Sequence, residues 1–183
     1  MENIFRESPI IAAVNSDELL EKACKSDIDV VFVLYGSILS LPGIVDILKE
    51  SGKTVIVHTD LITGLSSKDI AVDFIKEKTR ADGIITTKPT LLKRAKELDL
   101  VAGERSFLVD SMALSATVSR IKSFRPDFLE VMPGLIPRVI RELSSFGVPI
   151  VAGGLISTRG EIMEALGAGA SAISSTSPDI WAL

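Results

Sequence analysis

Short runs rich in Val and Ile alternate along the chain with longer segments whose apolar residues fall at helical spacing. Each run is bounded by Gly, Pro, Asp or Ser, and this alternation is typical of parallel strands joined by crossover helices. Because the runs are almost wholly apolar, we expect strands buried on both faces. The eight predicted strands are 9–14, 29–35, 54–58, 83–86, 105–109, 128–132, 149–152 and 172–174.

Seven segments between these runs have the periodicity and the boundary residues of helices. Ser16 stands just before the first segment, and Pro89 opens the fourth, where its missing N–H costs nothing. Gly147 and Gly167 follow the last two closely, as expected near a helix C-terminus. The predicted helices are 18–23, 41–50, 68–78, 89–98, 111–123, 136–145 and 158–166.

These elements predict an α/β fold, a small (β/α)8 barrel that forms a single domain over residues 1–183. The eighth helix would be reduced to the stub 178–183. Barrels of this class usually run to about 250 residues, so the loops must be minimal. An open, doubly wound sheet of the flavodoxin type is the alternative. The barrel is favoured because the strands are evenly spaced to the end, and Asn15-Ser16-Asp17 follows the first strand in place of a glycine-rich fingerprint.

Composition narrows the class of protein. A formal charge of −4 and a pI of about 5.1 argue against a protein that coats nucleic acid through bulk charge, although a local basic face remains compatible. The single cysteine, Cys24, cannot form an internal disulfide, which indicates a reducing compartment. Neither a signal peptide nor an apolar run of about 18 residues stands out, so we expect a soluble cytoplasmic protein without membrane contact.

The loops after the last two strands are the first candidate site, because ligands bind barrels at the carboxyl ends of the strands. Barrels often hold phosphate between the seventh and eighth loops, where glycines allow close backbone approach and hydroxyls donate hydrogen bonds. Pro178 opens a short helix beside them. Two ordinary turns are the alternative interpretation. The predicted phosphate-binding residues are Gly153, Gly154, Ser174, Ser175 and Thr176.

Polar residues at strands three to six form the second candidate site. His58, the one histidine of the chain, could act as a base or a hydrogen-bond donor, and a capped turn is the alternative. For Arg105 and Glu130, an ion pair that fills a polar layer is equally compatible. Solvation alone would also explain Lys88. The predicted polyol-binding residues are His58, Asp60, Glu130, Arg105 and Lys88.

The strand ends carry no paired general acid and base, no nucleophile elbow and no Schiff-base lysine. A single histidine, without a cluster at ligand spacing, offers little to a metal. We therefore expect no catalytic residue, no cofactor and no metal. The predicted mouth suits the binding of a small phosphorylated polyol better than its transformation.

Five stretches in this order resemble a known family: 57-VHTDLITG-64, 83-GIITT-87, 107-FLVDS-111, 126-PDFLEVMPG-134 and 152-AGGLI-156. From about residue 9 to residue 181 the chain resembles the glycerol-3-phosphate responsive antiterminators, also called glycerol uptake operon antiterminators. The resemblance implies a small barrel, a glycerol 3-phosphate ligand and binding to the leader mRNA of glycerol-utilisation operons, where such a protein prevents transcription termination. Glu104 departs from the family pattern, in which Gln often precedes the arginine, and adds a negative charge beside Arg105.

Two groups of cations are candidates for RNA contact. Solvated helix faces balanced by nearby acids are the alternative in an acidic protein, and aromatic residues are scarce at 5%. RNA binding thus follows from the resemblance alone. The first group is Arg120, Lys122, Arg125, Arg138 and Arg141, and the second is Lys88, Lys93, Arg94 and Lys96.

Three functions remain in competition. A regulator would require glycerol 3-phosphate to bind two states with different affinity. A phosphosugar isomerase or epimerase, or a related lyase, would use His58 with Asp60 or Glu130 for proton transfer. A phosphate-ester sensor would act through a protein partner. The stub of the last helix would leave apolar surface uncovered, which predicts a homodimer.

Overall fold

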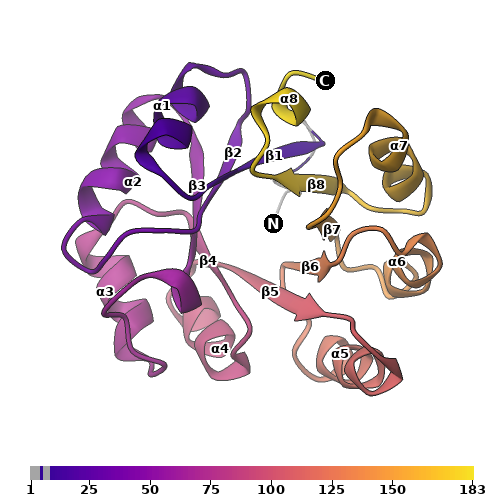
Figure 1. Ribbon diagram of the computed structural model, residues 1–183. Coiled ribbons are helices and arrows are strands. Elements are labelled where there is room, and N and C mark those ends of the chain that lie inside the picture. The colour runs from indigo at the N-terminus through magenta and orange to yellow at the C-terminus, as the bar shows by residue number, and fades with distance from the viewer. Residues whose placement is uncertain (1–4, 6–8) are drawn as a thin grey trace.

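The computed structural model describes Phe5 and residues 9–183. Eight parallel strands follow one another in sequence order around a closed barrel, and the last strand pairs with the first through Ile10 and Ile173. Helices surround the strands (Figure 1). The predicted (β/α)8 barrel is confirmed, and the flavodoxin-type alternative is wrong because an open sheet would have two unpaired edges.

The strands are β1 (Ile10–Val14), β2 (Val30–Val33), β3 (Thr54–His58), β4 (Gly83–Thr86), β5 (Val101–Phe107), β6 (Phe128–Met132), β7 (Ile150–Gly153) and β8 (Ala172–Ser175). The helices are α1 (Asp17–Lys25), α2 (Leu41–Glu50), α3 (Ile70–Lys78), α4 (Pro89–Glu97), α5 (Ser111–Phe124), α6 (Pro137–Ser144), α7 (Arg159–Gly167) and α8 (Pro178–Trp181). A 3₁₀ turn, η1 (Thr59–Leu61), follows β3.

The predicted bounds of β3, β4 and β6 are confirmed, whereas β5 begins four residues earlier than predicted and ends two earlier. Its start is weakly strand-like in sequence, but Val101 pairs with Gly83 because β5 must form a ladder with β4 to keep the barrel closed. Smaller differences have a local cause. Pro9 and Pro149 stand just outside their strands because proline has no N–H for the ladder.

Local chemistry fixes several helix starts. The Ser16 hydroxyl accepts a hydrogen bond from the amide of Leu19, and Thr158 and Glu161 form a capping box at α7. Proline occupies the first turn of α2, α4, α6 and α8. The last helix is the predicted stub, only four residues long.

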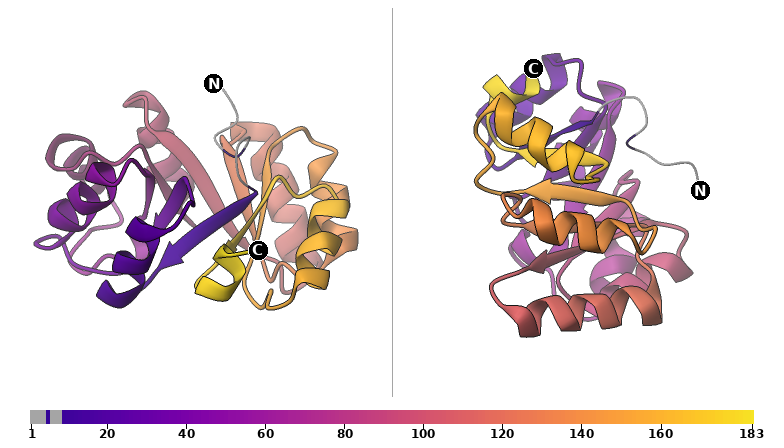
Figure 2. Two further views of the ribbon diagram at one scale, coloured as in Figure 1. Left: turned by 90° about the horizontal axis from the view of Figure 1, so that it is seen from above. Right: turned by 90° about the vertical axis from the view of Figure 1, so that its right-hand side faces the viewer.

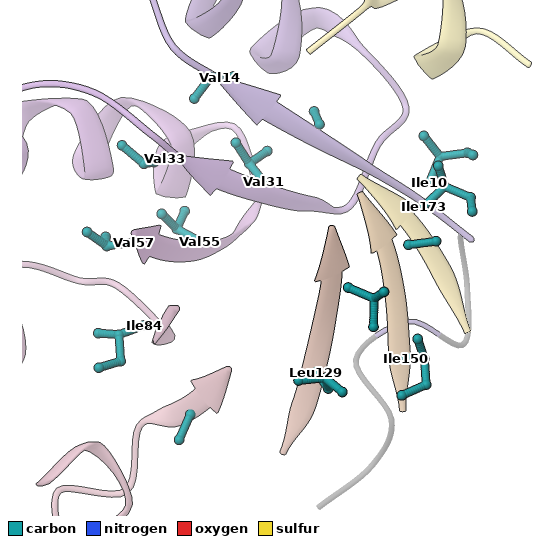
Figure 3. Packing of buried hydrophobic residues seen from close by; sticks show 14 of the residues in the cluster. Ile10, Val14, Val31, Val33, Val55, Val57, Ile84, Leu129, Ile150 and Ile173 are labelled. Atoms are coloured by element: carbon teal, nitrogen blue, oxygen red, sulfur yellow. The ribbon is translucent and has the colours of Figure 1, made fainter. Parts of the chain in front are cut away.

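Two apolar layers hold the fold together. The outer layer lies between the strands and the helices, and Figure 3 shows members of it on successive strands. The inner layer fills the barrel near the amino ends of the strands, where the ring of Phe128 meets Phe5 edge-on and stacks on Phe32. Because aromatic rings close this end, a ligand can enter the barrel only from the carboxyl ends of the strands.

The exposed side chains show whether the short last helix leaves apolar surface uncovered, as the sequence predicted. The stub α8 buries Ile180 and Trp181, so it is not the source of exposed apolar surface that we predicted. The most exposed large apolar side chains in the described residues are Leu39, Val109, Met112 and Leu155. These lie on loops or helix starts after β2, β5 and β7. The homodimer stays a prediction. No helix in the described part of the chain has the length and apolarity needed to cross a bilayer.

Candidate functional site: a polar pocket at the barrel mouth

A cavity of about 340 Å³ opens where the strands end, and this volume lies within the range of small-molecule pockets. Its polar lining comes from β5, β6, β8 and the loops after β7 and β8; its apolar lining includes Leu34, Met132 and Leu155. Larger hollows of about 570, 500 and 360 Å³ lie on the outside of the described part of the chain, lined mainly by helices. The mouth is the better candidate because polar groups converge there. They are Arg105, Glu130, Ser157, Ser174, Ser175, Thr176 and Ser177.

Three buried side chains form the floor of this pocket. Arg105 Nε donates a hydrogen bond of 2.5 Å to Glu130 Oε2, and Ser174 Oγ donates one of 2.6 Å to Glu130 Oε1. All three side chains are at most 8% exposed. Arg105 donates only through Nε among the described residues, so its two terminal nitrogens keep their donors for a ligand. The ion-pair interpretation of Arg105 and Glu130 is therefore correct, and both residues also line the pocket.

Gly153 is required by this floor. A Cβ at position 153 would lie 2.5 Å from Ser174 Oγ and 2.8 Å from Glu130 Oε1. The missing side chain thus makes room for the hydrogen bond between Ser174 and Glu130, a purpose that the sequence did not reveal. Gly154 lines the pocket itself, with φ of +72°, a conformation that glycine adopts without strain.

Glu104 does not add charge to the mouth, contrary to what its position beside Arg105 suggested. Side chains alternate along a strand, so Glu104 lies on the outer face of β5 and pairs with Arg120 of α5. Its carboxylate is almost fully buried, and burial raises its pKa although Arg120 opposes the effect. Among the described residues, the Arg105 guanidinium consequently has one carboxylate partner, Glu130.

His58 is buried at the end of β3, and neither ring nitrogen has a hydrogen-bond partner among the described residues. Burial is the main cause that lowers its pKa to about 4, and the positive charge of Arg105 adds to the effect. The ring is therefore neutral at pH 7. Thr59 beside it is also buried, with an unpaired hydroxyl. Unpaired buried polar atoms are costly, so these two side chains are candidates for ligand contact.

The carboxylate of Asp60 already has hydrogen-bond and ion-pair partners among its neighbours. Its carboxylate accepts hydrogen bonds from the amide and hydroxyl of Thr87 and from the hydroxyl of Thr86, and it pairs with Lys88 at 3.0 Å. Burial alone would raise its pKa, but the hydrogen bonds from Thr87, Lys88 and Thr86 outweigh this effect and lower it. Asp60 and Lys88 therefore join the loops after β3 and β4, and neither lines the mouth cavity.

The loop after β8 supplies hydroxyls of different availability. The Ser175 hydroxyl accepts from the amide of Ser177, and the Ser175 carbonyl accepts from the indole of Trp181. Thr176 is exposed at the rim, and its hydroxyl forms no hydrogen bond with the described residues. Thr176 is thus well placed to turn its hydroxyl toward a ligand.

The structure therefore divides the predicted site residues into a group at the mouth cavity and a group outside it. Gly154, Arg105, Glu130 and the three residues 174–176 line one cavity, with Gly153 beneath them. His58, Asp60 and Lys88 lie toward β3 and β4 outside its lining. The sequence analysis missed Ser157, four residues after the end of β7, and Ser177, two residues after the end of β8. No group of three or more His, Cys, Asp or Glu able to hold a metal occurs in the described residues.

Comparison with known proteins decides the family. Residues 10–181 match the model of a family described as glycerol-3-phosphate responsive antiterminator. The chain belongs to this antiterminator family. A crystal structure of the glycerol uptake operon antiterminator regulatory protein of Listeria monocytogenes matches with a TM-score of 0.95 at 31% identity, over 100% of this chain and 99% of that one.

Two further relatives match nearly the whole chain. A glycerol uptake operon antiterminator-related protein of Thermotoga maritima matches with a TM-score of 0.87 at 37% identity, over 96% of this chain and 99% of that one. The Escherichia coli protein named Uncharacterized protein YgcP is 35% identical over 182 residues, or 99% of this chain and 95% of that protein. Orotidine 5′-phosphate decarboxylase of Pyrococcus horikoshii, at 21% identity and a TM-score of 0.68 over 91% of this chain and 88% of that one, shares the fold.

Proposed function

We propose that this antiterminator-family protein is a regulator that binds glycerol 3-phosphate at the barrel mouth and binds leader mRNA of glycerol-utilisation operons, where it prevents transcription termination. The observation that carries the proposal is the family match over residues 10–181, together with a polar mouth cavity of suitable size. In this proposal glycerol 3-phosphate changes the population of the RNA-binding state.

The chemistry of the pocket supports a small phosphate ester as ligand. The free terminal nitrogens of Arg105 offer two donors to an anion, and the Thr176 hydroxyl offers another at the rim. The buried Glu130 carboxylate on the other side of Arg105 accepts hydrogen bonds, which suits hydroxyl groups. A molecule with a phosphate at one end and hydroxyls at the other matches this arrangement.

The arrangement does not favour the isomerase alternative. That alternative needs His58 to exchange protons with Asp60 or Glu130. Asp60 is held by Thr87 and Lys88, while Glu130 is held by Arg105 and Ser174. His58 has no hydrogen-bond partner among the described residues, so the proton-transfer pair is not assembled here.

Calorimetry tests the ligand. Glycerol 3-phosphate should bind more tightly than either glycerol or inorganic phosphate, because only the ester uses both halves of the pocket. Gly153→Val is a poor control because its side chain would collide with Ser174 and Glu130. Thr176→Glu is better: the residue is exposed, and like charges a few Å apart repel by about 2–4 kcal/mol, so affinity should fall at least about tenfold.

Ser119→Glu, on the exposed surface of α5, is the matched control with the same charge change and should keep its affinity. In vitro transcription across a leader terminator tests the second half of the proposal. The protein should raise read-through, and glycerol 3-phosphate should alter that effect. If the protein binds the leader RNA but read-through stays unchanged, the regulatory function is contradicted, even if the protein also binds the ligand.

A further inference from the structure

We propose that RNA contacts the closed end of the barrel, at the carboxyl ends of α4, α5 and α6, on the side of the molecule opposite the ligand mouth. This inference rests on the proposed function and assigns a surface to it. We call the surface the basic ledge. Its residues are Lys96, Lys122, Phe124, Arg125 and Phe146.

The ledge is a connected structure. Lys96 Nζ lies 5.0 Å from the ring centre of Phe124 and donates a hydrogen bond of 2.5 Å to the carbonyl of Arg125. Arg125 Nη2 in turn donates to the carbonyl of Gly147, just after α6. Lys122 Nζ lies 5.5 Å from the ring centre of Phe146. Contacts thus tie together the ends of α4, α5 and α6, and Figure 2 shows α5 and α6 side by side along the barrel.

The positive charge of the ledge is largely uncompensated. Arg94, Arg105 and Arg120 each form an ion pair with a carboxylate. Lys122 and Arg125 form none with the described residues. Lys96 is 3.6 Å from Asp127, which is itself mostly buried.

The neighbouring helix α6 extends this surface. It adds Arg141, which is exposed in the last turn of α6 and has no ion-pair partner among residues 5 and 9–183. In a chain with a net charge of −4, such a gathering of unpaired cations points to an anionic partner.

Arg125 occupies a backbone conformation that normally belongs to glycine. It ends α5 with φ of 49° and ψ of 83°, in the left-handed region. A side chain there costs roughly 1 kcal/mol relative to glycine. The guanidinium of Arg125 donates to Gly147 and, because the residue is exposed, is also accessible to a partner.

The aromatic rings identify the class of anion. Phe124 and Phe146 pack against the core and are partly exposed beside the cations, and aromatic rings next to cations are the combination that proteins use for unpaired RNA bases. A lipid surface would need apolar side chains that insert among the acyl chains, whereas these two rings pack against the core of the protein. The expected target is therefore single-stranded or looped RNA.

The test compares two double variants by fluorescence anisotropy, with a labelled leader transcript of a glycerol-utilisation operon from the source organism. Lys122→Ala combined with Arg125→Gly removes two ledge charges, and Lys25→Ala combined with Lys76→Ala removes two exposed charges from α1 and α3. Affinity of the ledge variant should fall at least about tenfold. The slope of log K against log salt should shrink by about 1.4, which corresponds to two phosphate contacts on single-stranded RNA.

Arg125→Gly also separates binding from folding. Because glycine suits this backbone and offsets the lost contacts to Gly147 and Phe146, the melting temperature of the ledge variant should change little, and its glycerol 3-phosphate affinity should equal that of the wild type. Phe146→Leu keeps apolar packing but removes the stacking surface, and it should weaken RNA binding about fivefold or more.

The outcomes are distinguishable. Loss of RNA affinity in the ledge variant alone supports the proposal. Equal loss in both double variants would show an effect of bulk charge, and unchanged affinity in the ledge variant would place the RNA elsewhere; either result overturns it. A wild-type protein that binds the ligand but no leader RNA would contradict the proposed function and this surface with it.

Discussion

Arg105 of β5 and Glu130 of β6 stand opposite each other in register inside the barrel, and the guanidinium donates to the carboxylate over 2.5 Å. Each is nearly fully buried, and Ser174 holds the second oxygen of Glu130. A buried pair of this kind adds little to stability compared with apolar packing, but the loss of one partner leaves a buried charge uncompensated. The pair therefore sets both the polarity of the pocket and its sensitivity to mutation.

Glu130→Ala should lower the free energy of unfolding by about 3–5 kcal/mol, because Arg105 remains buried without its partner. Urea denaturation measures this change. The double variant Arg105→Met with Glu130→Leu should lose clearly less than the sum of the single variants, since both charges are removed together. Additive losses would contradict the coupling between the two side chains.

His58 should make the protein less stable in mild acid. Its pKa is about 4 when folded and about 6.5 when unfolded, so below pH 6.5 the unfolded chain takes up a proton that the folded chain refuses. Between pH 7 and pH 5 this should lower the free energy of unfolding by about 2 kcal/mol.

The matched variant for this effect is His58→Gln, measured by urea denaturation at both pH values. Subtracting the pH dependence of the variant's free energy of unfolding from that of the wild type removes the contributions of carboxylates such as Glu104. Asp60, whose pKa is lowered, loses its stabilising effect at still lower pH. An equal pH dependence in both proteins would show that His58 is not the buried neutral residue described above.

Gly103→Ala should strongly destabilise the fold, because a Cβ at this position would lie 2.0 Å from the ring of Phe128. Gly43→Ala is the contrasting change. Position 43 is exposed within α2, and an added Cβ meets nothing within 4 Å, so alanine should stabilise the helix by about 0.5–1 kcal/mol. Thermal melting of the two variants should shift in opposite directions.

Thr158→Ala should cost about 1 kcal/mol, because the capping box at the start of α7 would be lost. Thr158→Ser keeps the hydroxyl that accepts from the amide of Glu161 and should retain most of the stability. Chemical denaturation of both variants checks the result. Similar losses in the two would indicate that packing of the threonine methyl group, and not the cap, stabilises the helix start.

Much of the fold followed from local signals. The alternation of apolar runs with helical segments predicted the barrel and its stub helix, and Ser16 capped its helix as its position indicated. The start of β5 could not be predicted in this way. The segment from Val101 to Glu104 contains Ala and Gly and becomes a strand because β4 and β6 pair with it on either side.

The candidate site shows the same division. The order of the strands was enough to predict that residues 153–154 and 174–176 gather at one end, because parallel strands of a barrel all end there. Strand order could not show that Asp60 is taken by Thr87 and Lys88, since those contacts depend on the path of two loops.

The sequence by itself determined which residues stand at the carboxyl ends of the strands, through the period of its strands and the positions of its turns. The tertiary structure decided which of them remain free to bind. It placed the side chain of Glu104 outside the barrel and that of Arg105 inside it. The missing side chain of Gly153 leaves room for the hydrogen bond between Ser174 and Glu130. The physical reason is that the period of the strands fixes where each strand ends and which way it runs. Whether a polar atom is available depends instead on neighbours that packing brings from distant parts of the chain.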